Sequence, residues 1–131
     1  MTTNSAEAIV VLLTAANGEE AARLAEMLVG AHLAACVQIL PEVKSVYRWK
    51  GNVERQAEVL LIAKTTRSKF EEFERQVRAL HSYETPEIIA LPLIAGSSSY
   101  LDWLSASVDL RRTYVESVDA AEKARSQEAK A

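Results

Sequence analysis

His81 begins a short run of residues that could bind a metal ion. It is followed by Tyr83, Glu84 and Glu87, and imidazole nitrogen together with carboxylate oxygen suits divalent copper or zinc. At the end of a predicted helix, the same histidine could instead stabilise the negative end of the helix dipole. The residues alone favour this capping role, and both interpretations stay open.

A second group of residues combines aromatic rings with charges. Lys64 ends an apolar segment, where an ammonium group beside a carboxylate could bind an anion. The group forms either a ligand cleft or a subunit interface with a salt bridge and packed rings. The predicted binding residues are Tyr47, Trp49, Glu54, Lys64, Tyr83 and Glu87.

Cys36 and His32 are weaker candidates. Cys36 lies among small apolar residues, which is more typical of a structural cysteine than of a thiolate that binds a soft metal. His32 has no neighbour at ligand spacing and is interpreted as a capping or surface residue. The sequence contains no CxxC or HExxH motif and no glycine-rich phosphate loop, so we do not expect an enzyme.

Composition restricts the class of protein. The chain has 131 residues, 49% of them hydrophobic and 25% charged, with a net charge of −3, which indicates one soluble domain and argues against nucleic-acid binding. A single cysteine excludes an intrachain disulfide and suits a reducing compartment. With no basic leader pattern and no apolar run long enough to cross a bilayer, we expect a cytoplasmic protein that does not bind membranes.

The first half of the chain must provide a strand, a helix and a hairpin. The apolar run 9–13 is a strand candidate, and Asn17 with Glu20 resembles a capping box that begins a helix ending near Gly30. Residues 34–65 read as a long hairpin whose turn is predicted at 51–52.

This turn sets the expected register of the hairpin. It places Lys50 opposite Val53, Trp49 opposite Glu54 and Tyr47 opposite Gln56, so that two aromatic residues and a carboxylate share one face.

The second half repeats the pattern. Ser68 and Glu71 predict the start of a second helix, and residues 87–95 predict a fourth strand, with Pro92 at a bulge or a sheet edge. Ser99 with Asp102 predicts the cap of a third helix. The β-α-β-β-α-β order followed by a helix predicts an α+β, ferredoxin-like sandwich over residues 1–110, and residues 111–131 read as a polar tail.

The strands are apolar on both faces. The segments 9–13, 59–62 and 88–91 lack the alternation expected when helices cover only one side of a sheet. An exposed second face would leave an unusually large apolar patch. We therefore expect self-association through the sheet.

Ordered motifs in the chain resemble one family. They are Ala-Cys-Val at 35–37, Leu-Pro at 40–41, Tyr-Arg-Trp at 47–49, Arg-Ala-Leu-His at 78–81, Pro-Glu-Ile-Ile at 86–89 and Tyr-Leu-Asp-Trp-Leu at 100–104. Together they resemble the divalent-cation tolerance protein CutA family. The resemblance implies a ferredoxin-like homotrimer with inward-facing sheets that acts in metal-ion tolerance or response.

The resemblance also implies copper(II) or another divalent cation as a ligand, with His81 as its anchor. Metal-binding members use a histidine pair there and a cysteine on the first strand, whereas this chain has Leu80 and Leu13. The implied binding is therefore weak. The same trimeric plan is similar to that of PII signalling proteins, which implies an alternative in which clefts between subunits bind a small anionic effector.

Overall fold

One antiparallel sheet organises the molecule, a computed structural model that describes residues 7–110. Its strands lie in the order β2-β3-β1-β4, and the predicted tail, residues 111–131, lies outside the described part. The bounds are β1 Ala8–Ala15, β2 Cys36–Trp49, β3 Asn52–Thr66 and β4 Ile88–Pro92.

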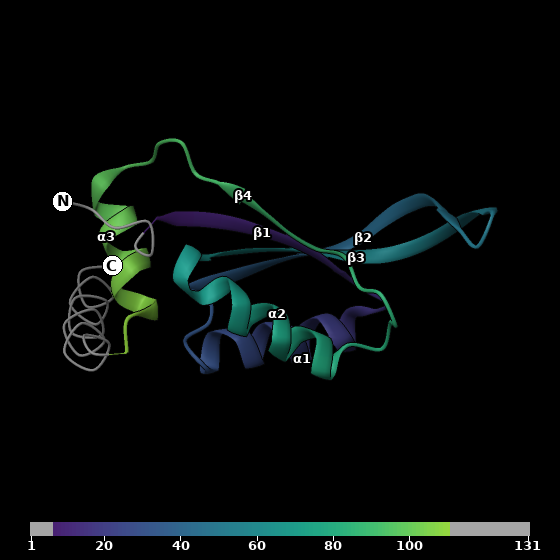
Figure 1. The fold of residues 1–131 in the computed structure, drawn as a ribbon, viewed down its shortest axis with the longest axis horizontal. Coiled ribbons are helices and arrows are strands. Elements are labelled where there is room, and N and C mark those ends of the chain that lie inside the picture. Colours follow the sequence, from purple (N-terminus) through teal and green to yellow (C-terminus); the bar gives the residue numbers. More distant parts are fainter. Residues whose placement is uncertain (1–6, 111–131) are drawn as a thin grey trace, which may run out of the picture.

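Helices cover one face of this sheet and one of its ends. The helices α1 (Gly18–Gly30) and α2 (Phe70–Leu80) lie side by side beneath the sheet, while α3 (Ser98–Val108) stands at the end opposite the projecting β2–β3 hairpin (Figure 1). The predicted α+β, ferredoxin-like order is confirmed.

The core follows the alternation of the strands. On β1, Val11 and Leu13 are fully buried against the helices, where they meet side chains such as Leu24 and Phe73. Residues on the other face are only partly covered, and Ile89 and Leu91 on β4 are 51% and 50% exposed. The single chain therefore leaves one apolar sheet face without a cover.

The hairpin turn differs from the prediction. The two-residue loop is Lys50-Gly51, so that Trp49 pairs with Asn52 and Tyr47 pairs with Glu54. Both loop residues have positive φ, 51° for Lys50 and 83° for Gly51, as a type I′ turn requires. The predicted partners were wrong by two residues. An even shift preserves the faces, so Tyr47 and Trp49 still share a side with the carboxylate.

The predicted helix ends are partly right. Asn17 accepts a hydrogen bond from the Glu20 backbone N–H at 2.9 Å, and α1 ends at Gly30 as expected. Ser68 does not cap α2, because it lies in a 3₁₀ turn (Arg67–Lys69) and contacts Thr66 instead. Ser97, rather than Ser99, caps α3 by accepting from the Tyr100 N–H.

The fourth strand is shorter than predicted. It ends at Pro92 instead of reaching residue 95, and it pairs only with β1. Pro92 thus lies at the end of an edge strand, which confirms the expected edge position. A proline has no backbone N–H to donate to a neighbouring strand, so it is disfavoured inside a sheet.

Candidate functional site

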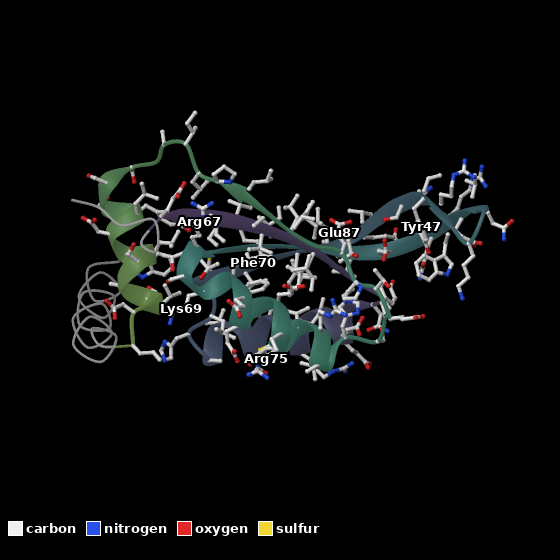
Figure 2. All side chains as sticks on the ribbon, viewed as in Figure 1. Tyr47, Arg67, Lys69, Phe70, Arg75 and Glu87 are labelled. Carbon is white, nitrogen blue, oxygen red and sulfur yellow. The ribbon has the colours of Figure 1, made fainter. Side chains whose placement is uncertain are left out.

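A concave site lies at the base of the hairpin. A cleft of about 630 Å³ opens between the β2–β3 hairpin and the segment that leads into β4. Tyr47 projects from the hairpin while Glu87 lies where β4 approaches it (Figure 2). We call this site the hairpin cleft. Its lining residues are Thr14, Ser45, Val46, Tyr47, Trp49, Gln56, Glu58, Tyr83, Glu84, Thr85, Pro86 and Glu87.

A chain of hydrogen bonds runs through the hairpin cleft. The Tyr47 hydroxyl donates to Gln56 Oε1 at 2.6 Å, Gln56 Nε2 donates to the Tyr83 hydroxyl oxygen at 3.4 Å, and Tyr83 donates to Glu58 Oε2 at 2.8 Å. Burial and the contact with Glu58 raise the pKa of Tyr83 well above its ordinary range. The phenol protons are therefore held within the chain of bonds.

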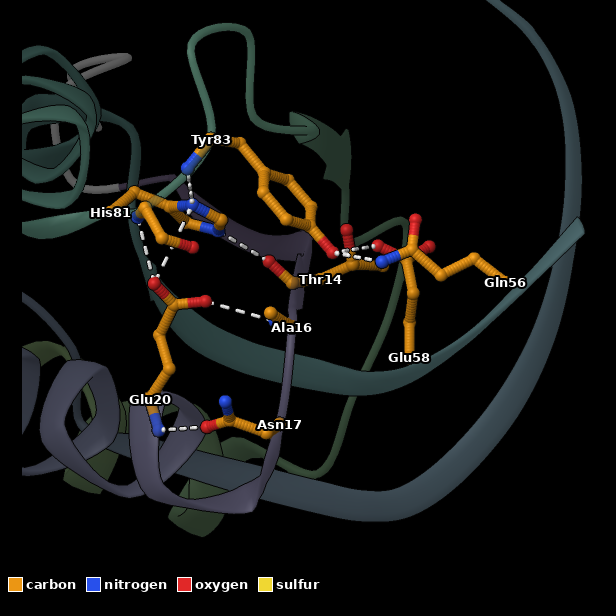
Figure 3. Close-up of polar contacts among 9 residues, drawn as sticks. Thr14, Ala16, Asn17, Glu20, Gln56, Glu58, His81 and Tyr83 are labelled. Atoms are coloured by element: carbon orange, nitrogen blue, oxygen red, sulfur yellow. Dashed lines mark hydrogen bonds and ion pairs between the residues drawn. The ribbon is translucent and has the colours of Figure 1, made fainter. Parts of the chain in front are cut away.

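The His81 ring is fixed by two backbone groups. Its Nε2 donates to the Thr14 carbonyl at 2.6 Å, and its Nδ1 accepts from the Tyr83 N–H at 3.0 Å (Figure 3). Because one nitrogen must donate and the other must accept, these partners select the neutral Nε2–H form. The side chain is fully buried.

Glu20 fixes the same loop from the helix side. Its Oε1 accepts from the Ala16 N–H at 2.9 Å and its Oε2 from the Ser82 N–H at 2.7 Å. Burial raises the pKa of Glu20, but these hydrogen bonds outweigh it and hold the pKa below its ordinary value. Glu20 therefore joins the start of α1 to the loop that carries Tyr83 (Figure 3).

Four of the six predicted binding residues meet in the hairpin cleft. They are Tyr47, Trp49, Tyr83 and Glu87. Glu54 pairs with Tyr47 across the hairpin but does not line the cleft. Lys64 lies elsewhere: it pairs with Val10 of β1, and its Nζ donates to Gln38 Oε1 at 2.7 Å. In the described part of the chain, no ion pair joins the Lys64 ammonium group to a carboxylate.

Cys36 and His32 lie at the other end of the molecule. The Cys36 Sγ is 3.5 Å from the Tyr100 hydroxyl oxygen, and this hydrogen bond, followed by burial, raises the pKa of Tyr100 to about 12. His32 follows the end of α1 with a φ of 58°, and its Nδ1 donates to the Ser107 carbonyl at 3.3 Å. The predicted capping or surface role of His32 agrees with this position.

Glu58 lines the hairpin cleft but was not predicted as a binding residue from the sequence. Its side chain lies on the same hairpin side as Tyr47 and is only 7% exposed. A carboxylate directly before the apolar run 59–62 is a weak signal, because strands often begin with a charged residue. Gln56 was likewise not predicted as a site residue, and Glu84 was predicted only as a carboxylate near His81 that could assist metal binding.

A copper ion does not fit the surroundings of His81. Both ring nitrogens are engaged with backbone groups, so a metal would have to replace one of those bonds. Among the described residues, no group of three or more histidine, cysteine or acidic side chains is arranged to hold an ion, whereas tight sites use three or four protein ligands. Residues 7–110 also contain no helix long and apolar enough to span a bilayer.

Comparison with known proteins identifies the family. The family described as CutA1 divalent ion tolerance protein matches residues 9–107. The chain belongs to the CutA1 family. The names within this family describe tolerance to divalent ions and indicate no enzymatic activity.

CutA1 relatives match at the level of both sequence and fold. The divalent-cation tolerance protein CutA of Thermus thermophilus is 48% identical over 95 residues, which is 72% of this chain and 92% of the relative. The chloroplastic CutA protein of Arabidopsis thaliana is also 48% identical, over 76% of this chain, and the chain spans 54% of that longer relative.

Solved CutA1 structures carry the same fold. The crystal structure of CutA1 from Oryza sativa has a TM-score of 0.78 at 42% identity and covers 82% of this chain and 99% of its own. The CutA structure from Archaeoglobus fulgidus has a TM-score of 0.76 at 40% identity and covers 78% of this chain and 99% of its own. These likenesses confirm the ferredoxin-like architecture.

Proposed function

We propose that this protein acts in tolerance of divalent cations as a homotrimer whose working site is the hairpin cleft. The observation that carries the proposal is the charge of the cleft. Glu58, Glu84 and Glu87 line it, and no lysine, arginine or histidine does so among the described residues. A site lined by one sign of charge concentrates ions of the other sign.

The uncovered sheet face supports self-association. Exposed apolar residues on that face, including Ile89 and Leu91, form a continuous surface with the partly buried Leu12 and Ile62. Packing of these faces against one another removes the surface from water. The family resemblance supports an arrangement with the sheets facing inward.

Copper binding remains a prediction of weak affinity. A divalent ion at His81 must displace a backbone hydrogen bond, and an ion in the hairpin cleft meets carboxylates that do not converge. We expect a Kd on the order of micromolar or weaker for copper(II). We also propose a cytoplasmic location, which rests on composition alone. The relatives do not share one location, because they include proteins named periplasmic and chloroplastic.

An anionic effector is the alternative for a PII-like signalling role. Lys64 favours it, because within residues 7–110 its Nζ bonds only the neutral Gln38 and lies on the sheet face that a second subunit would approach. In that case the Lys64 ammonium group of one subunit reaches a ligand cleft at a neighbouring subunit. The alternative predicts that a nucleotide binds and that Lys64→Ala removes this binding.

Calorimetric titration of the full chain with copper(II), zinc and a nucleotide separates these functions. We expect weak binding of the metal ions and none of the nucleotide. His81→Ala and Cys36→Ser serve as paired variants: loss of copper binding only in the first would assign the ion to His81, outside the lining of the hairpin cleft, and would contradict the cleft as the working site. Nanomolar copper affinity, or nucleotide binding that depends on Lys64, would contradict the proposal.

A further inference from the structure

We infer that the hairpin cleft binds a small organic ammonium ion, a protonated amine carried on an apolar group. This inference rests on the proposed function, in which the cleft is the working site, and it names the chemical class of the ligand. Five features carry it: the distribution of charge on the hairpin, the buried Glu58 carboxylate, the state of the polar groups in the cleft, its aromatic walls, and its size.

The hairpin separates its charges by side. Residues paired directly across two antiparallel strands point to the same side. The observed register places on one side Trp49, Tyr47, Ser45 and Val43 with their partners Asn52, Glu54, Gln56 and Glu58. The basic residues Lys44, Arg48 and Arg55 belong to the alternate pairs and lie on the opposite side. The side that lines the cleft is therefore acidic and aromatic.

Glu58 provides a buried negative charge. It is 7% exposed. Among the described residues, its carboxylate accepts one hydrogen bond, which the Tyr83 hydroxyl donates to Oε2. No ion pair involves Glu58 in the described part of the chain. A buried carboxylate without a positive partner is costly, so a bound cation would stabilise it.

The polar groups of the cleft are arranged to accept rather than to donate. The hydroxyl protons of Tyr47 and Tyr83 are used within the hydrogen-bond chain, as is an N–H of Gln56. The two phenol groups therefore have no proton left to donate to a ligand, and their remaining polar capacity is the lone pairs of the oxygens. This arrangement favours a cation over an anion.

The aromatic walls suit an ammonium group in particular. Lys50 Nζ already lies 5.7 Å from the centre of the Trp49 ring, within the range of a cation–π contact. Tyr47 and Tyr83 supply two further rings in the same cleft. The apolar part of an organic cation would pack on these rings while its ammonium group approaches Glu58.

The size of the cleft favours a molecule over a bare metal ion. A volume of about 630 Å³ is within the range typical of small-molecule sites. The carboxylates of the cleft do not form a group that could hold a single ion. Separated acceptors on an aromatic wall can instead contact different parts of a molecule.

Three phenyl compounds of similar size test the sign of the charge. Benzylammonium, benzyl alcohol and benzoate are titrated into the full-length protein by calorimetry, with Trp fluorescence as a second readout. We expect benzylammonium to bind at least about tenfold more tightly than benzyl alcohol, since a desolvated cation–π contact with a charge-assisted hydrogen bond exceeds about 1.4 kcal/mol. Benzoate should bind most weakly.

Matched variants locate the binding. Glu58→Gln should weaken benzylammonium about tenfold and leave benzyl alcohol unchanged. Glu54→Gln removes an equal charge from the same strand outside the cleft and should have little effect. Glu87→Gln, at an exposed position in the lining, repeats the test without altering a buried group.

Several results would overturn the inference. Equal affinity for the amine and the alcohol would show a plain apolar cavity, and preference for benzoate would show an anion site. Benzylammonium binding unaffected by both Glu58→Gln and Glu87→Gln would place the ligand elsewhere. Copper binding without benzylammonium binding would remove this inference and leave the proposed function; absence of both would remove both.

Discussion

Glu20 connects two segments that are far apart in the sequence, the start of α1 and the loop that contains Ser82. Its carboxylate accepts one N–H from Ala16 and another from Ser82, while its own N–H donates to Asn17. The side chain is 2% exposed, and buried charges persist only when they are hydrogen-bonded in this way. Since Ser82 directly precedes Tyr83, Glu20 also positions the loop of the hairpin cleft.

Replacing Glu20 with Gln should destabilise the protein by about 1–3 kcal/mol at neutral pH, because one N–H would face an amide donor instead of an oxygen. The pKa of Glu20 is held below its ordinary value of 4.5. Its contribution is therefore present above that pH and is lost as the pH falls through the folded-state pKa.

Urea unfolding across this pH range measures the effect. Glu19→Gln is the control, because Glu19 occupies the same first turn of α1 but is exposed. The gap between wild type and Glu20→Gln should narrow in acid. A gap of the same size at every pH would show that ionisation of Glu20 does not contribute, and a gap matched by Glu19→Gln would show that only the helix dipole is involved.

For individual residues, the sequence predicted structural roles better than it predicted contact partners. The spacing of Asn17 and Glu20 predicted a helix start, and Asn17 does cap it. The second function of Glu20 could not be predicted, because Ser82 lies 62 residues away. For Lys64 the predicted partner was not found. Its positive charge suggested an ion pair, but its position on β3 places it opposite Val10.

The hairpin is the element whose local geometry was hardest to predict. Lys50-Gly51 and Gly51-Asn52 are both plausible two-residue turns, and each contains the same glycine. The structure places Gly51 second, at a φ of 83°. Lysine then takes the first position, which also requires positive φ. Local preference could not exclude this arrangement, because strand pairing selects the register.

Gly51→Ala should destabilise the hairpin by about 1 kcal/mol. A methyl group added at this position would meet no atom within 4 Å, so the cost comes from backbone conformation and not from a clash. Gly30→Ala is the matched control, since that site is equally open but lies in α1 without positive φ, and it should be neutral or stabilising.

Thermal unfolding of both variants tests the turn. A loss for Gly51→Ala alone supports the Lys50-Gly51 loop. A neutral Gly51→Ala would mean that this glycine does not hold a left-handed conformation in solution, and the register of Tyr47 and Glu58 would then need revision.

At the scale of the whole molecule, composition and order predicted the architecture. Alternating strand and helix segments gave the ferredoxin-like order, because each element must bury one apolar face. The strands that were apolar on both faces indicated a second covered surface. In one chain that surface includes Leu12, Ile62, Ile89 and Leu91, and the last two are about half exposed. A lone chain cannot specify what covers it.

We expect a homotrimer whose assembly depends on this face. Ile89→Lys places an ammonium group where the single chain leaves the side chain 51% exposed, so the monomer fold should survive. In a packed interface the same charge would lose its water without gaining a partner, which costs several kcal/mol per subunit. The variant should therefore dissociate at micromolar concentration.

Light scattering coupled to size exclusion measures the mass, and circular dichroism checks that the fold is retained. Leu80→Lys is the control, because Leu80 is a 44% exposed apolar residue at the end of α2, which packs on the opposite face of the sheet. Wild type and Leu80→Lys should both elute as trimers and Ile89→Lys as a folded monomer. A monomeric wild type, or a trimer that tolerates Ile89→Lys, would show that the apolar sheet face is not the surface through which the subunits assemble.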